Sequence, residues 1–85
     1  MFFGSKEYKV SIKGRSSVIY AEGQREARIE TEMLTGPTDL VIYFEQFRSW
    51  QPPFQNDVLS ERDRQRIKSN IAKELEASGL TLEWN

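Results

Sequence analysis

The sequence has 85 residues, a net charge of −1, and neither cysteine nor histidine. The missing cysteines exclude disulfides and thiolate chemistry, and the missing histidines remove the commonest general base and the commonest zinc ligand. The near-neutral charge argues against a dedicated nucleic-acid-binding domain, because such domains are usually clearly basic.

The length favours a single domain with one hydrophobic core, which we expect to span residues 1–85. No apolar run approaches the roughly 20 residues that a membrane helix needs. The first five residues are too short and too weakly patterned for a signal peptide. We therefore expect a soluble domain located in the cytosol.

Two short strands are predicted first. Residues 7–12 alternate, with Tyr8, Val10 and Ile12 on one face, which indicates a half-buried strand. A turn over residues 13–15, in which Gly14 can take a positive φ, leads to a second strand over residues 16–21. We expect the two strands to pair as a hairpin.

Residues 25–33 show the clearest alternation in the chain and predict a third strand. The inward side chains are expected to be Ala27, Ile29, Thr31 and Met33. The outward side chains are then Glu26, Arg28, Glu30 and Glu32.

Residues 40–44 predict a fourth strand that is apolar on both faces, so it is either central or covered on both sides. A single helical turn is expected over residues 46–50. Pro52 and Pro53 prevent its continuation, because the residue before a proline avoids the α region.

The longest element is a helix that begins after Ser60. Ser60 and Asp63 have the spacing of a capping box. An apolar stripe of Ile67, Ile71 and Leu75 follows, and Gly79 is placed to end the helix as a left-handed cap. Residues 81–84 then alternate as a final strand, with Leu80, Leu82 and Trp84 inward. The predicted fold is α+β, with a mostly antiparallel sheet of about five strands (β-β-β-β-α-β) and one C-terminal helix packed on it.

The sequence favours binding over catalysis. No serine lies in a Gly-x-Ser-x-Gly elbow and no glycine-rich loop is built to hold phosphate. Glu26, Glu30 and Glu32 share one strand face, on which residues two apart lie roughly 6.5–7 Å from each other, but a solvated charged face is the simpler interpretation. We expect no catalytic residue, no cofactor and no metal.

Charge is unevenly distributed along the chain. Residues 21–45 carry six acidic side chains against two basic ones, whereas residues 1–20 are basic and residues 46–85 are balanced. An acidic surface in the middle of the chain would attract a basic partner and speed its association.

A small RNA-binding module is the alternative. It would use the basic start of the helix with exposed aromatic residues of the sheet. The cations concerned are Arg62, Arg64, Arg66 and Lys68. Acidic residues interleave with them, which is more typical of a solvated helical face. An adaptor that adds an edge strand to a partner is a third possibility.

The aromatic residues divide into two groups. Their phase places Tyr8, Tyr20, Phe44 and Trp84 in the core. Tyr43, Trp50 and Phe54 either cover the second face of the fourth strand as a small core or remain exposed for binding.

Several segments together resemble a family of small bacterial immunity proteins that accompany polymorphic toxins, including those of contact-dependent growth inhibition systems. The resemblance covers residues 34–83. The segments are Leu34-Thr-Gly-Pro37, Leu40-Val-Ile-Tyr43, Trp50-Gln-Pro-Pro53, Asp57, Leu59-Ser-Glu61 and Arg66-Ile-Lys-Ser-Asn-Ile71. The resemblance implies an inhibitor without catalysis that binds one toxin domain, usually a nuclease. It also implies structural roles for Tyr43, Trp50, Pro52, Pro53 and Ser60.

These inferences predict tight one-to-one binding of a basic toxin domain that cleaves RNA or DNA. The acidic contacts are expected to be Glu26, Glu30 and Glu32 on the third strand, with Glu45 and Asp57 beside the fourth. Tyr43 or Trp50 would serve as the central anchor.

Overall fold

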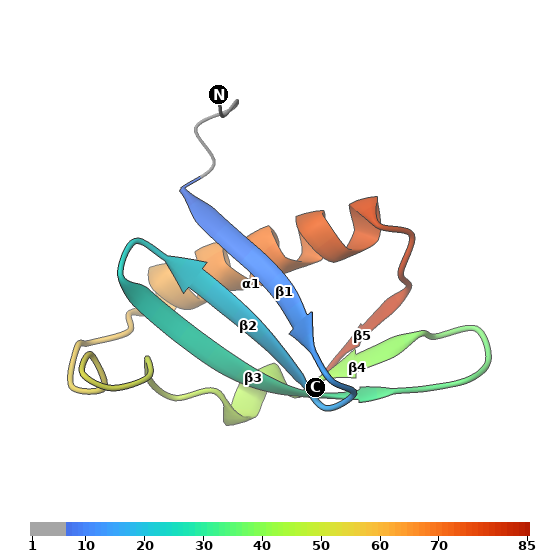
Figure 1. The fold of residues 1–85 in the computed structure, drawn as a ribbon, viewed down its shortest axis with the longest axis horizontal. Helices are drawn as coiled ribbons and strands as arrows, with labels where there is room; N and C mark the ends of the chain where they lie inside the picture. Colours follow the sequence, from blue (N-terminus) through green and yellow to red (C-terminus); the bar gives the residue numbers. More distant parts are fainter. Residues whose placement is uncertain (1–6) are drawn as a thin grey trace.

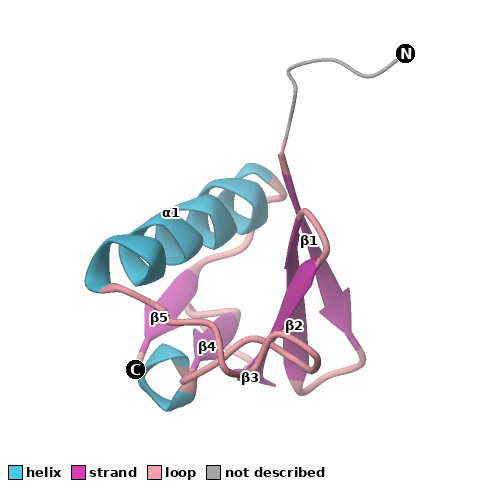
Figure 2. Ribbon diagram, turned by 90° about the vertical axis from the view of Figure 1, so that its left-hand side faces the viewer, coloured by secondary structure: helices cyan, strands magenta, loops and turns pink. Residues whose placement is uncertain are grey.

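The computed structural model describes residues 7–85, which form one five-stranded sheet covered on one face by a helix (Figures 1 and 2). The elements in chain order are β1 (Tyr8–Lys13), β2 (Ser17–Glu22), β3 (Arg25–Met33), β4 (Leu40–Ile42), the 3-10 helix η1 (Phe44–Gln46), α1 (Glu61–Ala77) and β5 (Leu82–Trp84). The predicted α+β fold and its β-β-β-β-α-β order are confirmed. Residues 1–5, considered above for a signal peptide, lie outside the described residues.

The strands lie in sequence order across the sheet, from β1 to β5. The first four are antiparallel to their neighbours, and β5 pairs parallel to β4. A parallel pair needs a crossover connection, which α1 supplies between β4 and β5. No helix among the described residues is long and apolar enough to span a membrane.

The fourth strand and the helical turn differ from prediction. The strand ends at Ile42, because Tyr43 leaves the extended region at φ −88° and ψ 67°. The helical turn therefore forms at residues 44–46, not at residues 46–50 as the sequence suggested. The apolar residues of this segment correctly predicted that both faces of β4 are buried, but they did not predict the residue at which the strand ends.

The core lies between the sheet and α1 and is closed at one end by aromatic side chains. The sheet contributes Val18, Tyr20, Ala27, Ile29, Leu40 and Ile42, the helix contributes Ile67, Ile71 and Leu75, and the segment after β4 contributes Phe44, Phe47 and Trp50. Met33 was predicted to be inward but is 48% exposed. Met33 pairs with Leu40 at the last position of the β3–β4 ladder. Its side chain has the predicted inward phase, but it lies at the end of the strand, where it stays exposed.

Both ends of α1 form as predicted. The Ser60 hydroxyl accepts from the Asp63 N–H, and the Asp63 carboxylate accepts from the Ser60 N–H. At the other end Gly79 has φ +91°, and the Leu80 N–H bonds the Leu75 carbonyl. This is the left-handed cap that satisfies the last carbonyls of a helix.

The segment between β4 and α1 protects an edge of β3. Because β4 has only three residues, the first part of β3 has no strand beside it on that side. Instead, the Tyr43 N–H bonds the Glu30 carbonyl and the Gln51 N–H bonds the Glu26 carbonyl. This segment thus satisfies backbone groups that an open edge would leave exposed.

Candidate functional site

The sheet face that points away from α1 carries most of the predicted contacts. We call it the open face, because no helix within residues 7–85 covers it (Figure 2). Strand side chains alternate between faces, so Glu26, Glu30 and Glu32 all lie on it along β3, and all three are exposed. The structure brings these three predicted residues together.

Two further residues extend this acidic row across β4 and β5. Glu32 and Glu83 flank Val41 in the sheet register, one from each neighbouring strand. Two strand spacings separate them, roughly 10 Å. The Tyr43 hydroxyl donates to Glu32 Oε1 at 2.7 Å. We call Glu26, Glu30, Glu32, Tyr43 and Glu83 the acidic face.

Electrostatics of the acidic face differ from those of the rest of the sheet. Within residues 7–85 its four carboxylates form no ion pair. The hydrogen bond to Glu32 is the main cause that raises the pKa of Tyr43, followed by burial and by the charges of Glu32 and Glu83. On the same face Arg28 lies between Glu26 and Glu30 on β3, and β1 carries Lys9 and Lys13. The open face therefore changes from basic at β1 to mainly acidic at β3–β5.

The acidic face is not arranged as a metal centre. Among the described residues no group of three His, Cys, Asp or Glu side chains is placed to hold a metal ion. The carboxylates form a row along β3 with one outlier on β5, instead of converging on a point. Such a row suits an extended, positively charged surface.

The remaining predicted contacts lie elsewhere. Glu45 is exposed in η1 and lines a separate hollow with Arg48, Glu61 and Arg64. Asp57 pairs with Arg25 at 2.6 Å. The two are therefore not part of the acidic face, although the sequence grouped them with it.

Trp50 is a core residue. It is 4% exposed, and its ring lies 6.4 Å from that of Tyr20 and 6.5 Å from that of Phe47. A side chain this buried is not presented to a partner, so the small-core interpretation describes it and the anchor interpretation does not. Phe54 also packs partly against the core, whereas Tyr43 stays half-exposed on the open face.

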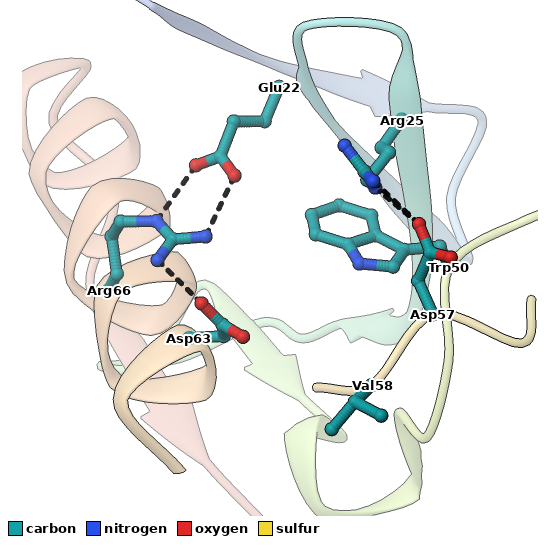
Figure 3. A pocket seen from close by; sticks show the side chains of 7 residues that line it. All are labelled: Glu22, Arg25, Trp50, Asp57, Val58, Asp63 and Arg66. Carbon is teal, nitrogen blue, oxygen red and sulfur yellow. Dashed lines mark hydrogen bonds and ion pairs between the residues drawn. The ribbon is translucent and has the colours of Figure 1, made fainter. Parts of the chain in front are cut away.

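A second charged region is a cleft between the β2–β3 turn, the start of α1 and the segment before α1 (Figure 3). Its volume is about 310 Å³. The lining residues, which we call the charged cleft, are Glu22, Arg25, Trp50, Asp57, Val58, Asp63 and Arg66.

One wall of the charged cleft is a network centred on Arg66 (Figure 3). The Arg66 guanidinium donates to both Glu22 oxygens at 2.9 and 2.8 Å and to Asp63 Oδ1 at 2.8 Å. The Tyr20 hydroxyl donates to Glu22 at 2.8 Å and accepts from Asn70 at 2.9 Å. The network therefore joins β2 to the first three turns of α1.

The network shifts the acidity of its members. Burial would raise the pKa of Glu22, but hydrogen bonds from Arg66 and Tyr20 outweigh it, and the net pKa is lowered. Hydrogen bonds from Arg66 and from Ser60 lower the pKa of Asp63 to about 2. Burial is the main cause that raises the pKa of Tyr20 to about 12. All three shifts favour the protonation states that the network already has.

The opposite wall is simpler. Arg25 donates through Nε and Nη2 to one oxygen of Asp57, and its guanidinium lies 4.9 Å from the centre of the Phe54 ring. Every ionised group of the charged cleft thus has an opposite charge from the same chain. The cleft fastens α1 and the preceding segment to the sheet. The sequence did not predict Glu22, Arg25 or Arg66 here, because their partners are 32 to 44 positions away.

The basic start of α1 is also used internally. Arg64 donates to the carbonyls of Phe44 and Phe47, and Arg66 belongs to the cleft network. Lys68 lies 5.1 Å from the Trp84 ring centre. Three of the four cations that would contact RNA are therefore engaged within the fold.

The chain is similar to a known protein family. The model of a family described as Immunity protein 74 matches residues 9–85. This range contains the segments over residues 34–83 that carry the resemblance described above, and it adds β1 to β3. None of the curated proteins compared with the chain matches it, and neither does any solved structure.

Proposed function

The chain belongs to the Immunity protein 74 family, and from this membership we propose that it neutralises its cognate toxin by presenting the acidic face to a basic nuclease domain. An immunity protein acts against a toxin, so the partner class follows from the family. The nuclease activity of that toxin and the face that binds it are our proposals.

The observation that carries the proposal is a set of carboxylates on the open face that form no ion pair within residues 7–85. A nuclease binds a phosphate backbone and therefore offers a positively charged surface. Glu26, Glu30, Glu32 and Glu83 offer a row of negative charge that such a surface attracts over long range. Occupying that surface would exclude the nucleic acid.

Tyr43 supplies a further contact on the acidic face. It lies beside Glu32, is half-exposed, and combines an aromatic ring with a hydroxyl. Tyrosine is enriched among residues that dominate binding energy. We propose Tyr43 as the anchor of a one-to-one complex and assign no catalytic step to the immunity protein.

The same proposal places the protein in the bacterial cytoplasm, as the protective partner of a polymorphic toxin or of a contact-dependent growth inhibition toxin. A nuclease damages the cell only where nucleic acid is present, so protection is needed in that compartment. The RNA-binding alternative is weakened because Arg64 and Arg66 are already bound within the chain.

The decisive test is purification of the protein from its host and identification of the protein that co-purifies with it. We expect one toxin domain per immunity protein and loss of nuclease activity in the complex. Recovery with nucleic acid and without a protein partner would overturn the proposal.

A charge-reversal triple then locates the interface. Glu26→Lys, Glu30→Lys and Glu32→Lys together should weaken toxin binding about 100-fold or more, because each like-charge contact costs binding energy and about 1.4 kcal/mol corresponds to tenfold. The matched control reverses Glu45, Glu61 and Glu76, which are exposed and lie off the acidic face. Equal affinities for the two triples, measured by calorimetry, would move the interface elsewhere.

A further inference from the structure

The outer edge of β1 is the longest exposed strand edge among the described residues. β1 is six residues long and pairs only with β2, so half of its backbone N–H and C=O groups face outward. The opposite edge, β5, has three residues. Unpaired strand edges are templates for pairing with another chain.

The two ends of β1 are covered differently on the core face. Tyr8 is half-buried, stacks on Tyr20 at 5.8 Å between ring centres, and donates to Glu74 of α1. Ile12 lies on the same face at the other end of β1, four residues after Tyr8, and is 39% exposed. If the β1 strand of a second copy paired antiparallel to this one, the half-buried Tyr8 end of each strand would lie beside the exposed Ile12 end of the other.

The charges on the open-face side of β1 select one alignment of two such strands. In an antiparallel pair, two residues can lie opposite each other only if the backbone N–H and C=O groups of both point toward the partner strand or both point away from it. These groups alternate along a strand, so the allowed alignments of two identical strands differ by steps of two residues. Centring the pair on Val10 places Glu7 opposite Lys13 of the second copy, and Lys9 opposite Ser11. The next alignments place Lys9 opposite Lys9 or Lys13, which is destabilising.

The alignment centred on Val10 also uses the whole edge. It pairs all residues from 7 to 13 with residues 13 to 7 of the second copy. On the core face it sets Tyr8 against Ile12 and Val10 against Val10, which are favourable cross-strand contacts. Lysines on edge strands generally discourage association; here they exclude the other alignments and leave this one.

We propose that two copies of the chain associate through β1, antiparallel, about a twofold axis at Val10. Such an axis continues the sheet from one copy into the other and keeps both acidic faces on the same side. Each copy therefore retains its own toxin-binding surface. The interface is narrow, which predicts a weak dimer, and the dimer does not depend on the proposed function.

Cysteine trapping tests the alignment, since the natural chain has no cysteine. Val10→Cys should give a disulfide-linked dimer on mild oxidation, because directly opposite Cα atoms lie about 4.5–5.5 Å apart. Ser11→Cys is the matched control: its copies would be about 8 Å apart, beyond disulfide reach. Cross-linking at position 11 in place of position 10 would overturn the proposed alignment.

Charge exchange supplies a second measurement that does not alter the apolar face. In sedimentation equilibrium at millimolar concentration, Glu7→Lys or Lys13→Glu alone should weaken association several-fold, and the two together should restore it. A wild-type chain that stays monomeric at this concentration, without trapping at position 10, would overturn the dimer and leave β1 open to a strand from another protein.

Discussion

The acidic face and the charged cleft are both rich in carboxylates, but within residues 7–85 only the cleft pairs its carboxylates with arginine side chains. In the charged cleft, Arg66 holds Glu22 and Asp63, and Arg25 holds Asp57. On the acidic face no described cation holds Glu26, Glu30, Glu32 or Glu83 in an ion pair. Acidity alone therefore does not identify a binding surface in this chain.

The difference follows from position in the fold. The cleft lies where three segments meet, so charged side chains from distant parts of the sequence can reach one another. The open face of a single sheet offers only neighbours along and across strands, and β3 places three glutamates and only one arginine, Arg28, at its outward positions. Charges paired internally contribute to stability, whereas unpaired charges are free to contact a partner.

The largest effect is expected for Trp50→Ala. Trp50 lines the charged cleft and belongs to the core, and removing a buried tryptophan costs about 3–5 kcal/mol. This is a large share of the roughly 5–15 kcal/mol that stabilises a small domain. Urea unfolding should show a much lower midpoint, while the protein that remains folded should keep its affinity for the toxin.

Val58→Ala is the matched control for Trp50. Val58 lines the same cleft but is 86% exposed, so the free energy of unfolding should change by less than about 0.5 kcal/mol. If Trp50→Ala retained its stability and lost toxin affinity, Trp50 would be an interface residue after all.

Arg66→Ala should have a moderate effect. It removes the hydrogen bonds to Glu22 and leaves that half-buried carboxylate without a cation. Arg66 is 40% exposed, so solvent screening limits the cost to about 1–2 kcal/mol. Arg62→Ala, on the same helix but without an ion pair to a described residue, should change the midpoint little.

The same variant has a distinct pH signature. The folded-state pKa of Glu22 and Asp63 lies below the unfolded value, so their contribution is complete above the unfolded pKa values of about 4–4.5. It is lost as pH falls from about 5 to 2. The stability gap between wild type and Arg66→Ala should therefore be full at pH 7 and close toward pH 2. A constant gap would mean that the network is not formed in solution.

The sequence predicted those parts of the fold that depend on near neighbours. The capping box joins positions three apart, the left-handed cap joins Leu75 to Leu80, and strand alternation needs only successive residues. The same alternation placed Glu26, Glu30 and Glu32 on one face. These features were predictable because their causes are local.

The missed features depend on tertiary contacts. Glu22 and Arg66 are 44 positions apart, and nothing in either local pattern indicates that they meet. Glu83 joins the acidic face only because β5 lies next to β4, an order that periodicity does not give. Local alternation correctly turned Glu83 outward, but its neighbours depended on topology.

The smallest effect compares two tyrosines, one in each region. Tyr20 and Tyr43 both donate to a glutamate, Glu22 and Glu32 respectively. Burial is the main cause of the raised pKa at Tyr20, whereas the hydrogen bond to Glu32 is the main cause at Tyr43. Glu32→Gln should therefore lower the pKa of Tyr43 toward its ordinary value of 10.0 and leave Tyr20 unchanged.

Ultraviolet titration of the phenolates measures this, with Glu30→Gln as the control that removes a neighbouring charge without breaking the bond. The urea midpoint should not change in either variant, since the Tyr43 hydroxyl is on the open face. An unchanged titration in Glu32→Gln would show that Tyr43 does not hold Glu32 in solution. In that case no side chain within residues 7–85 would donate a hydrogen bond to any of the four carboxylates of the acidic face, unlike the carboxylates of the charged cleft.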